Sequence, residues 1–323
     1  MKSVLTSRRG ALFAPFIALG VLALIAFTAW HFIADRISTE LAAQGLRWQS
    51  LEREGFPARI SLYLEAPQWQ GAGEQTGLAW QNERLSLTVM PFKGGHAIID
   101  FRGPHKLTGP NGQLRLAHQG NLMSAVIDTD GLNRASFDVQ APHVTARWNG
   151  LDVSARAANL ELHMRRGSSE RASERIDAAL ISKQLTMTRA DKRLALARVD
   201  ISASLPAAIM ERPLAAGDVI MLERAIVQRN ALSLVAKGRL KLRRTGYVDG
   251  TLDLDIVNLN AFADALVEFG LVARRDKQKL LLLGGLGAAL GGDTADRLSL
   301  PLQFKNKRSY LGGVKLGRAP RWR

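Results

Sequence analysis

The sequence contains no cysteine, although it is 323 residues long. Disulfide bonds, thiol nucleophiles, CxxC redox pairs, iron–sulfur clusters and thiolate zinc sites are therefore excluded. Anchoring through a lipidated cysteine is excluded for the same reason. The folded state must be stabilised by a buried core, and the chain is long enough to form one.

Recognisable catalytic motifs are missing as well. The chain has no GxSxG elbow, P-loop, HExxH or SxxK sequence. Its histidines lack a second metal ligand at helical spacing, and they are His31, His96, His105, His118, His143 and His163. We therefore expect no metal site, no cofactor and a non-enzymatic role. A site assembled from distant strands is the alternative.

Charge is absent from one long run, Gly10 to Ala34, which follows Lys2, Arg8 and Arg9. At about 1.5 Å per residue a helix of this length spans the roughly 30 Å hydrocarbon core of a membrane. The sequence predicts a tail over 1–9, a transmembrane anchor over 10–34 and a helical stalk over 35–45. We expect the membrane-anchor residues to be Phe13, Phe16, Leu22, Leu24 and Trp30, with Trp30 as an anchor at the membrane interface.

A cleaved signal peptide is the other interpretation of this run. Its apolar region would be shorter, about 7 to 15 residues, and would end at small residues. Here Phe27, Trp30 and Phe32 interrupt the small residues, which favours an uncleaved anchor. The basic residues before the run place the N-terminus in the cytoplasm and residues 35–323 outside it.

Acidic residues are outnumbered, with 29 Asp and Glu against 44 Lys and Arg and a formal net charge of +15. A basic protein of this kind suits anionic partners. The predicted compartment argues against nucleic acid and favours the membrane, lipid headgroups or a glycolipid. A basic but simply solvated surface explains the charge equally well.

Period-two alternation follows Gly45, which we expect to end the helix. Ile60, Leu62 and Leu64 alternate with polar residues, and similar runs recur along the chain. We expect strands over 60–65, 85–89, 97–101, 113–117, 125–129, 136–140, 143–148, 160–164, 176–188 and 194–205.

The predicted fold is mainly β: one transmembrane helix, then an elongated, curved antiparallel sheet or sandwich with a small C-terminal helical pair. The body spans 46–323. The polar segment 165–175 is the best internal break and divides possible lobes 46–165 and 176–323.

A hairpin over 232–258 is the clearest element. Lys237, Arg239, Lys241 and Arg243 share one face, which by itself resembles a headgroup-binding stripe. Asp249, Asp253 and Asp255 share the same face of the next strand, so we favour cross-strand ion pairs that largely neutralise the stripe. The opposite, apolar face is the candidate ligand face, formed by Leu232, Leu234, Leu240, Leu242, Leu252, Leu254 and Ile256.

Two helices are predicted near the C-terminus. Asn260 is expected to cap the first, which carries Phe262, Leu266 and Phe269 and ends at Gly270. The second is expected over 276–290. Its Gly285 and Gly287 resemble part of a dinucleotide-binding fingerprint, but the strand and acidic residue that such a site requires are missing.

Several segments resemble a bacterial family known only as domain of unknown function 2125. They are Gly55-Phe56-Pro57, Ala79-Trp80, the stretch 96–101, alternating Leu298, Leu300, Leu302 and Phe304, and the ending Leu316-Gly317-Arg318-Ala319-Pro320. The likeness covers nearly the whole chain, although Lys305 to Arg308 replace an acidic, glycine-containing turn. It implies an inner-membrane protein with a periplasmic β-rich body, and it implies no catalytic residue. A weaker, pattern-level likeness is to AsmA-like envelope proteins.

Three hypotheses follow for the function. The protein binds or passes lipid-like molecules along an apolar sheet face, or it is a scaffold that pairs with another envelope protein by strand addition. A periplasmic hydrolase is the third and least favoured. An open groove would favour lipid handling and a closed core would favour the scaffold, and the sequence leaves both shapes open.

Overall fold

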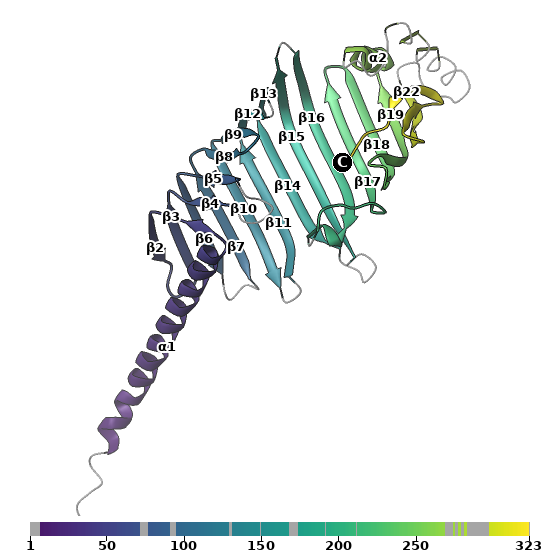
Figure 1. Cartoon of the computed structure of the whole chain (residues 1–323). Coiled ribbons are helices and arrows are strands. Elements are labelled where there is room, and N and C mark those ends of the chain that lie inside the picture. Colours follow the sequence, from purple (N-terminus) through teal and green to yellow (C-terminus); the bar gives the residue numbers. More distant parts are fainter. Residues whose placement is uncertain are drawn as a thin grey trace, which may run out of the picture.

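The structure, a computed structural model, describes residues 7–71, 77–90, 95–128, 131–148, 150–167, 174–190, 192–210, 212–268, 274, 277–278, 281–282 and 297–322. Within these ranges the chain forms one long helix followed by a 22-stranded antiparallel sheet (Figure 1). The helices are α1 (Ser7–Ala43), η2 (Ala207–Met210, a 3-10 turn) and α2 (Leu259–Glu268).

The strands fall into two groups. The first group is β1 (Leu46–Arg47), β2 (Ser50–Glu54), β3 (Ile60–Glu65), β4 (Gln68–Gln70), β5 (Ala79–Gln81), β6 (Arg84–Met90), β7 (His96–Arg102), β8 (His105–Gly109), β9 (Gly112–Ala117), β10 (Gly120–Asp128), β11 (Gly131–Gln140), β12 (His143–Trp148), β13 (Leu151–Arg156) and β14 (Asn159–Arg166). The second group is β15 (Arg175–Arg189), β16 (Lys192–Pro206), β17 (Val219–Arg229), β18 (Leu232–Leu242), β19 (Val248–Val257), β20 (Arg297–Lys305), β21 (Arg308–Leu311) and β22 (Val314–Arg318).

Strands of the first group occur in pairs separated by two residues, as in β11 and β12 or β13 and β14. One branch of pairing runs through β2, β3, β6, β7, β10, β11 and β14, which we call the long arm. The other runs through β1, β4, β5, β8, β9, β12 and β13, which we call the short arm. Both arms end on β15. Each pair is therefore a single strand bent in the middle, and the bends line up as a crease.

The backbone is continuous across the crease. Ala141 donates its N–H to the Ala158 carbonyl, and Ala158 donates to Lys183, each at 2.9 Å. Ala66, Ala141 and Gln184 have positive φ angles of 47°, 46° and 53°. Such bulge-like residues rotate a strand about its own axis, so the side-chain alternation shifts at the crease.

The apolar residues of the sequence change from even to odd positions where the strand rotates. In β15, Ile176, Ala178 and Leu180 occupy even positions, whereas Leu185 and Met187 beyond Gln184 occupy odd positions. The apolar residues thus stay on one face of the sheet while the strand turns the corner. Alternation by itself predicts such runs as strands and gives no sign of the bends.

The apolar sides of the two arms face each other. Trp80 of the short arm packs edge-on against Phe101 of the long arm, with 6.1 Å between ring centroids. Both contact a cluster that includes Ile60, Leu62 and Leu64, each 0% exposed. The molecule is therefore a creased sheet with an apolar inner face.

Helix α1 closes the N-terminal end of this inner face. Trp30 is 7% exposed and Ala34 is 0% exposed, and both pack on Ile60 and its neighbours. Trp30 Nε1 donates to the Arg59 carbonyl at 2.7 Å. Trp30, which we expected as an interfacial anchor, packs here on the body of the protein, because the buried sheet edge supplies both an apolar surface and a carbonyl acceptor.

The rest of α1 agrees with the expected anchor. Phe16, Leu22 and Leu24 are 69%, 62% and 63% exposed, and Phe13 lies outside the residues whose side chains are described. Within the described chain, α1 is the one helix long and apolar enough to cross a membrane, by length and composition that also suit a signal sequence. Anchor and stalk form one helix that ends at Ala43, before Gly45 with φ +85°.

The C-terminal end is closed by α2 and by the tail. Asn258, not Asn260, caps α2, because its Oδ1 accepts the Ala261 N–H at 3.0 Å. The tail returns across the start of β19, where Val248 donates its N–H to the Pro320 carbonyl at 3.1 Å. Phe269, Gly270, Gly285, Gly287 and most of the predicted helix over 276–290 lie outside the described residues.

The other elements that we predicted from alternation are present. Each expected run falls within a strand, apart from residue 129, which is outside the described chain. The proposed break at 165–175 separates β14 from β15, but these strands pair with each other from Asn159↔Lys183 to Arg166↔Ile176. The sheet thus continues between the proposed lobes 46–165 and 176–323.

Candidate functional site

The apolar face predicted to bind a ligand is assembled as expected in β18 and β19. The register pairs Leu234 with Ile256 and places Ala236 opposite Leu254. Most of this face is filled, however. Five of its seven residues are at most 9% exposed in a cluster with α2 and β20, and they are Leu232, Leu242, Leu252, Leu254 and Ile256. We call this cluster the C-terminal core.

The same inner face continues through β10, β11, β14, β15 and β16. The register aligns one row of mostly large side chains, namely Met123, Phe137, Leu162, Leu180 and Ile201. It aligns a parallel row of alanines interrupted by one methionine, namely Ala125, Ala135, Met164, Ala178 and Ala203. We call these two rows the central floor.

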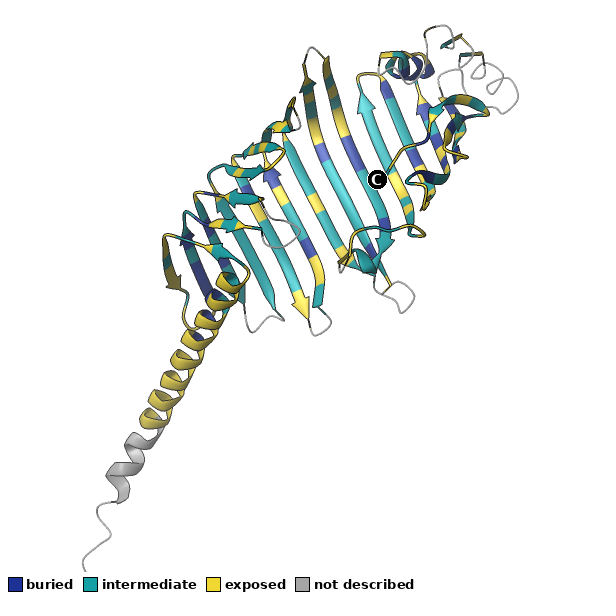
Figure 2. Cartoon of the chain, in the orientation of Figure 1, coloured by how far each residue is buried: buried dark blue, intermediate teal, exposed yellow. Residues whose placement is uncertain are grey.

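The central floor is less covered than either end. Leu162 is 37% exposed, whereas Val139 and Val199, one row closer to the crease, are 0% and 8% exposed. In Figure 2 the strands between the two ends are mostly of intermediate burial. No helix of the described chain packs along this row, although η2 touches β15. The sequence does not distinguish this region, because its alternation resembles that of the filled end.

Aromatic and polar side chains meet at the crease beside β7 to β10. Trp80 Nε1 donates to His105 Nδ1 at 3.2 Å, and His105 Nε2 lies 2.6 Å from the side-chain amide of Asn121. Burial, with a smaller contribution from the neighbouring His118, lowers the pKa of His105 to about 4. Because indole N–H groups only donate, the neutral ring accepts at Nδ1 and carries its proton on Nε2, which the Asn121 amide accepts through its oxygen, the side chain being turned to face the ring in that way.

His118 lies beside this group, with its ring centroid 5.2 Å from that of His105. Its pKa is also lowered, mainly by burial, while Gly103 and Asp100 oppose the shift. In the described residues no group of three or more metal-ligating side chains forms. We call the uncharged group of Trp80, His105 and Asn121, which joins the two arms, the polar lock. The sequence did not indicate it because His105 and His118 are 13 positions apart.

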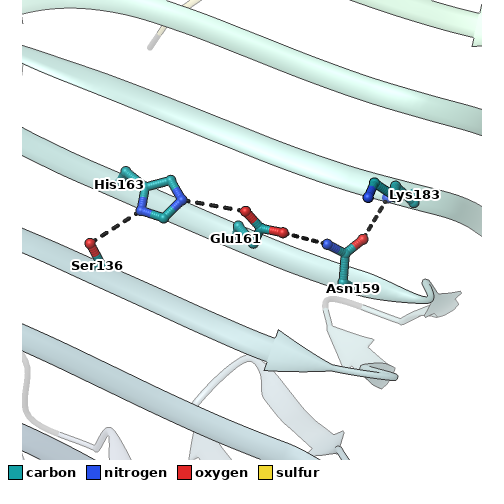
Figure 3. A network of polar contacts seen from close by, with 5 residues as sticks. All are labelled: Ser136, Asn159, Glu161, His163 and Lys183. Carbon is teal, nitrogen blue, oxygen red and sulfur yellow. Dashed lines mark hydrogen bonds and ion pairs between the residues drawn. The ribbon is translucent and has the colours of Figure 1, made fainter.

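The outer face of the long arm carries a network with the residue types of a hydrolytic triad (Figure 3). The Ser136 Oγ and His163 Nδ1 atoms are 3.1 Å apart, and His163 Nε2 is 3.5 Å from Glu161 Oε2. Asn159 Nδ2 donates to the other Glu161 oxygen at 2.6 Å. A hollow of about 470 Å³ adjoins Ser136 and His163.

Geometry limits what this network can do. Ser136 is on a central strand, paired with both Ser124 and His163, so its backbone groups belong to the sheet ladder. Acyl transfer requires free N–H donors directed at the developing oxyanion. His163 and Glu161 are also two residues apart on one strand, a spacing at which side chains on the same face of any sheet meet. The network is therefore best explained as cross-strand pairing.

The predicted hairpin is confirmed, but its charge pairing is not. Lys237 lies opposite Asp253 and Lys241 opposite Asp249, as the alternation required. Among the described residues the row makes one ion pair, Arg243 Nε to Asp249 Oδ2 at 2.6 Å. The acidic row thus lies across from the basic row as expected, but only this one close ion pair forms among the described residues, because neighbouring positions bring backbones together without forcing long, solvated side chains into contact.

One comparison with known proteins gives a match. A family model described as "Uncharacterized protein conserved in bacteria (DUF2125)" matches residues 31–320. The match begins in the part of α1 that approaches the body and ends in the C-terminal tail. No curated protein matches the chain. The likeness to AsmA-like proteins is not shown by these comparisons and stays a prediction.

Proposed function

The chain belongs to the uncharacterised bacterial family DUF2125, and from this premise we propose that it is a membrane-anchored envelope protein that binds lipid-like molecules along the central floor. Its body lies on the periplasmic side of the inner membrane. The observation that carries the proposal is the continuity of one apolar face from α1 to α2, which the helices of the described residues cover at its two ends and not in between.

The dimensions of this face suit acyl chains. From β3 to β20 it crosses twelve strands, which at about 4.8 Å per strand gives a length of roughly 50 Å. The central floor contains no charged side chain in either of its rows. A soluble metabolite would need polar partners that these rows do not supply, whereas an acyl chain needs none.

The position of the anchor supports the membrane as the source of the ligand. Helix α1 passes directly from its exposed apolar segment into the buried cluster around Ile60, since Phe16 is 69% exposed and Trp30 only 7%. The inner face therefore begins where the helix would leave a membrane. Removal of α1 as a signal peptide would also strip Trp30 from a buried position, which favours an uncleaved anchor.

Crosslinking from single positions tests the proposal in cells. We would place p-benzoylphenylalanine at Leu162, which is on the central floor, or at Leu122, which is 49% exposed on the opposite face. After irradiation, phosphorus-labelled lipid should be attached at position 162 and not at position 122. Equal labelling at both positions, or none at either, contradicts lipid binding.

The same experiment separates the scaffold role. A single protein adduct at position 162 without lipid would indicate that the central floor is covered by a partner protein. A non-catalytic role also predicts that Ser136→Ala leaves lipid labelling from position 162 unchanged. Loss of labelled lipid in this variant would instead implicate Ser136 in handling the ligand.

Orientation has its own test. A reporter that is active only outside the cytoplasm, fused after Arg323, should be active. This follows from the basic residues before the anchor. Activity of a cytoplasmic reporter at the same position would remove both the compartment and the proposed ligand.

A further inference from the structure

A dense group of basic residues covers the outer, polar face of the sheet near the C-terminal end. We call it the distal basic surface, and its members are Arg239, Lys241, Arg243, Arg244, Lys305 and Lys307. Two adjoining hollows of about 670 and 600 Å³ lie among them. Both hollows are lined by Lys241, Arg243 and Asp249, so together they form one continuous depression.

Its positive charge is poorly compensated. The only carboxylate that lines either hollow in the described chain is Asp249, and it is already paired with Arg243 at 2.6 Å. Arg239 lies opposite Thr251, which carries no charge. In the part of the chain that the structure describes, neither Arg239 nor Lys241 has an acidic side chain within 4.0 Å.

Two further lysines extend the surface beyond the hairpin. Lys305 Nζ lies 5.1 Å from the Tyr310 ring centroid, and Lys307 Nζ lies 5.9 Å from that of Tyr247. Cation–π contacts of this kind position an ammonium group without neutralising it. Both lysines are exposed and therefore present their charge to solvent.

The spacing of these cations suits several phosphate groups at once. Alternate residues of a strand are about 6.6 Å apart, so Arg239, Lys241 and Arg243 form a row, and Lys305 comes from two strands away at about 10 Å. Arginine binds phosphate oxygens in pairs and lysine binds them as a point charge. A single carboxylate would engage only a small part of this row.

We propose that the distal basic surface is a phosphate-binding site, which takes either the headgroups of anionic lipids or soluble phosphate compounds. It lies at the end of the sheet remote from α1 (Figure 1) and on the face opposite the apolar floor. A surface at this distance from α1 contacts phosphate groups that lie outside the membrane in which the anchor is embedded. The site is independent of the proposed function, since it shares no side chain with the central floor.

The test uses the full chain in nanodiscs of phosphatidylcholine. Flotation measures its binding to vesicles of phosphatidylcholine with or without phosphatidylglycerol. The variant Arg239→Gln/Lys241→Gln/Lys305→Gln removes three exposed charges. The matched control Arg193→Gln/Lys183→Gln/Lys192→Gln removes the same residue types from exposed positions of β15 and β16.

We expect binding only to the vesicles with phosphatidylglycerol, weakened by salt. Each basic residue near an anionic surface contributes about 1 kcal/mol, so the test variant should bind at least tenfold more weakly while the control stays within about twofold. Displacement by inorganic phosphate or glycerol phosphate identifies soluble phosphate as the ligand. Resistance to both identifies headgroups in a membrane.

Three results would overturn the site. They are equal binding to both kinds of vesicle together with no displacement by phosphate, an equal loss in the two variants, and tighter binding of a short DNA duplex than of either phosphate source. Lipid crosslinking at Leu162 reads the other face of the sheet. Either proposal can therefore fail while the other holds.

Discussion

The strands of the central floor and of the C-terminal core show the same alternation of apolar residues. Other elements bury the core, whereas the floor is only partly buried. Ile256 in the core is 0% exposed, whereas Leu162 on the floor is 37% exposed. The difference comes from α2, β20 and the returning tail, which fill one end and do not reach the middle. A strand pattern therefore indicates which face is apolar, and the elements packed on that face determine whether it is core or binding surface.

The largest expected effect concerns the N-terminal cover. Trp30→Ala should lower the free energy of unfolding by about 3 to 5 kcal/mol, because it empties a buried site and removes the donor to Arg59. Thermal unfolding of the full chain in nanodiscs measures this. Phe32→Ala, at a residue 72% exposed, is the control and should change stability by less than about 0.5 kcal/mol. Equal effects would mean that α1 does not belong to the folded body.

A direct test of the comparison uses one aliphatic truncation in each region. Ile256→Ala should cost about 2 to 5 kcal/mol, because the core cannot close around the lost atoms. Leu162→Ala should cost about 1 kcal/mol, because its side chain is already partly in water. Chemical unfolding of both variants under identical conditions compares the two values. A cost at Leu162 as large as at Ile256 would show that the floor is covered.

The polar lock at the crease should make stability depend on pH. His105 has its pKa lowered from an ordinary 6.5 to about 4, mainly by burial. The unfolded chain therefore binds more protons between these values, and the free energy of unfolding should fall as the pH drops from about 6.5 toward about 4. His105→Gln should flatten the unfolding profile in this range, leaving the smaller part that His118 contributes.

His96→Gln controls for the loss of a histidine as such. If this variant and His105→Gln flatten the profile equally, the crease is not the origin of the pH dependence. If neither does, His105 does not remain neutral in the folded chain. The result bears on the comparison because the crease holds the two arms on either side of the inner face.

The smallest effect concerns the link that holds α2 over the C-terminal core. Glu268 accepts two hydrogen bonds from Arg229 of β17, at 2.6 and 3.1 Å. Glu268→Gln should reduce stability by about 1 kcal/mol or less, because an exposed ion pair is screened by solvent. It should also speed hydrogen exchange in α2 without changing exchange in β14. An unchanged α2 would mean that apolar contacts alone hold the cover.

Much of this architecture was predictable from the residues. Alternation located the strands, the charge-free run located the long helix, and the parity of Leu234, Leu254 and their neighbours predicted the hairpin register. These features depend on the period of a strand, the rise of a helix and the polarity of nearby residues. Each is a local property that a chain carries before it folds.

Other features needed the folded chain. Trp80, His105 and Asn121 meet only because three strands bend at the same level. Among the described residues the row that begins at Lys237 forms one ion pair, because side chains, unlike backbones, are not fixed by register. Asn258 replaced Asn260 as the cap because α2 begins at Leu259, directly after β19, and so starts two residues earlier than expected.

The sequence by itself determined the long helix, the positions of the strands and the apolar side of each strand, since these follow from local periodicity. Only the tertiary structure decided that Trp30 is buried and that the apolar sides join into one face whose ends are filled and whose middle is only partly buried. The physical reason is that burial depends on what approaches a surface from outside it. Two strands with identical alternation become a core or a binding face according to whether a helix such as α2 packs against them.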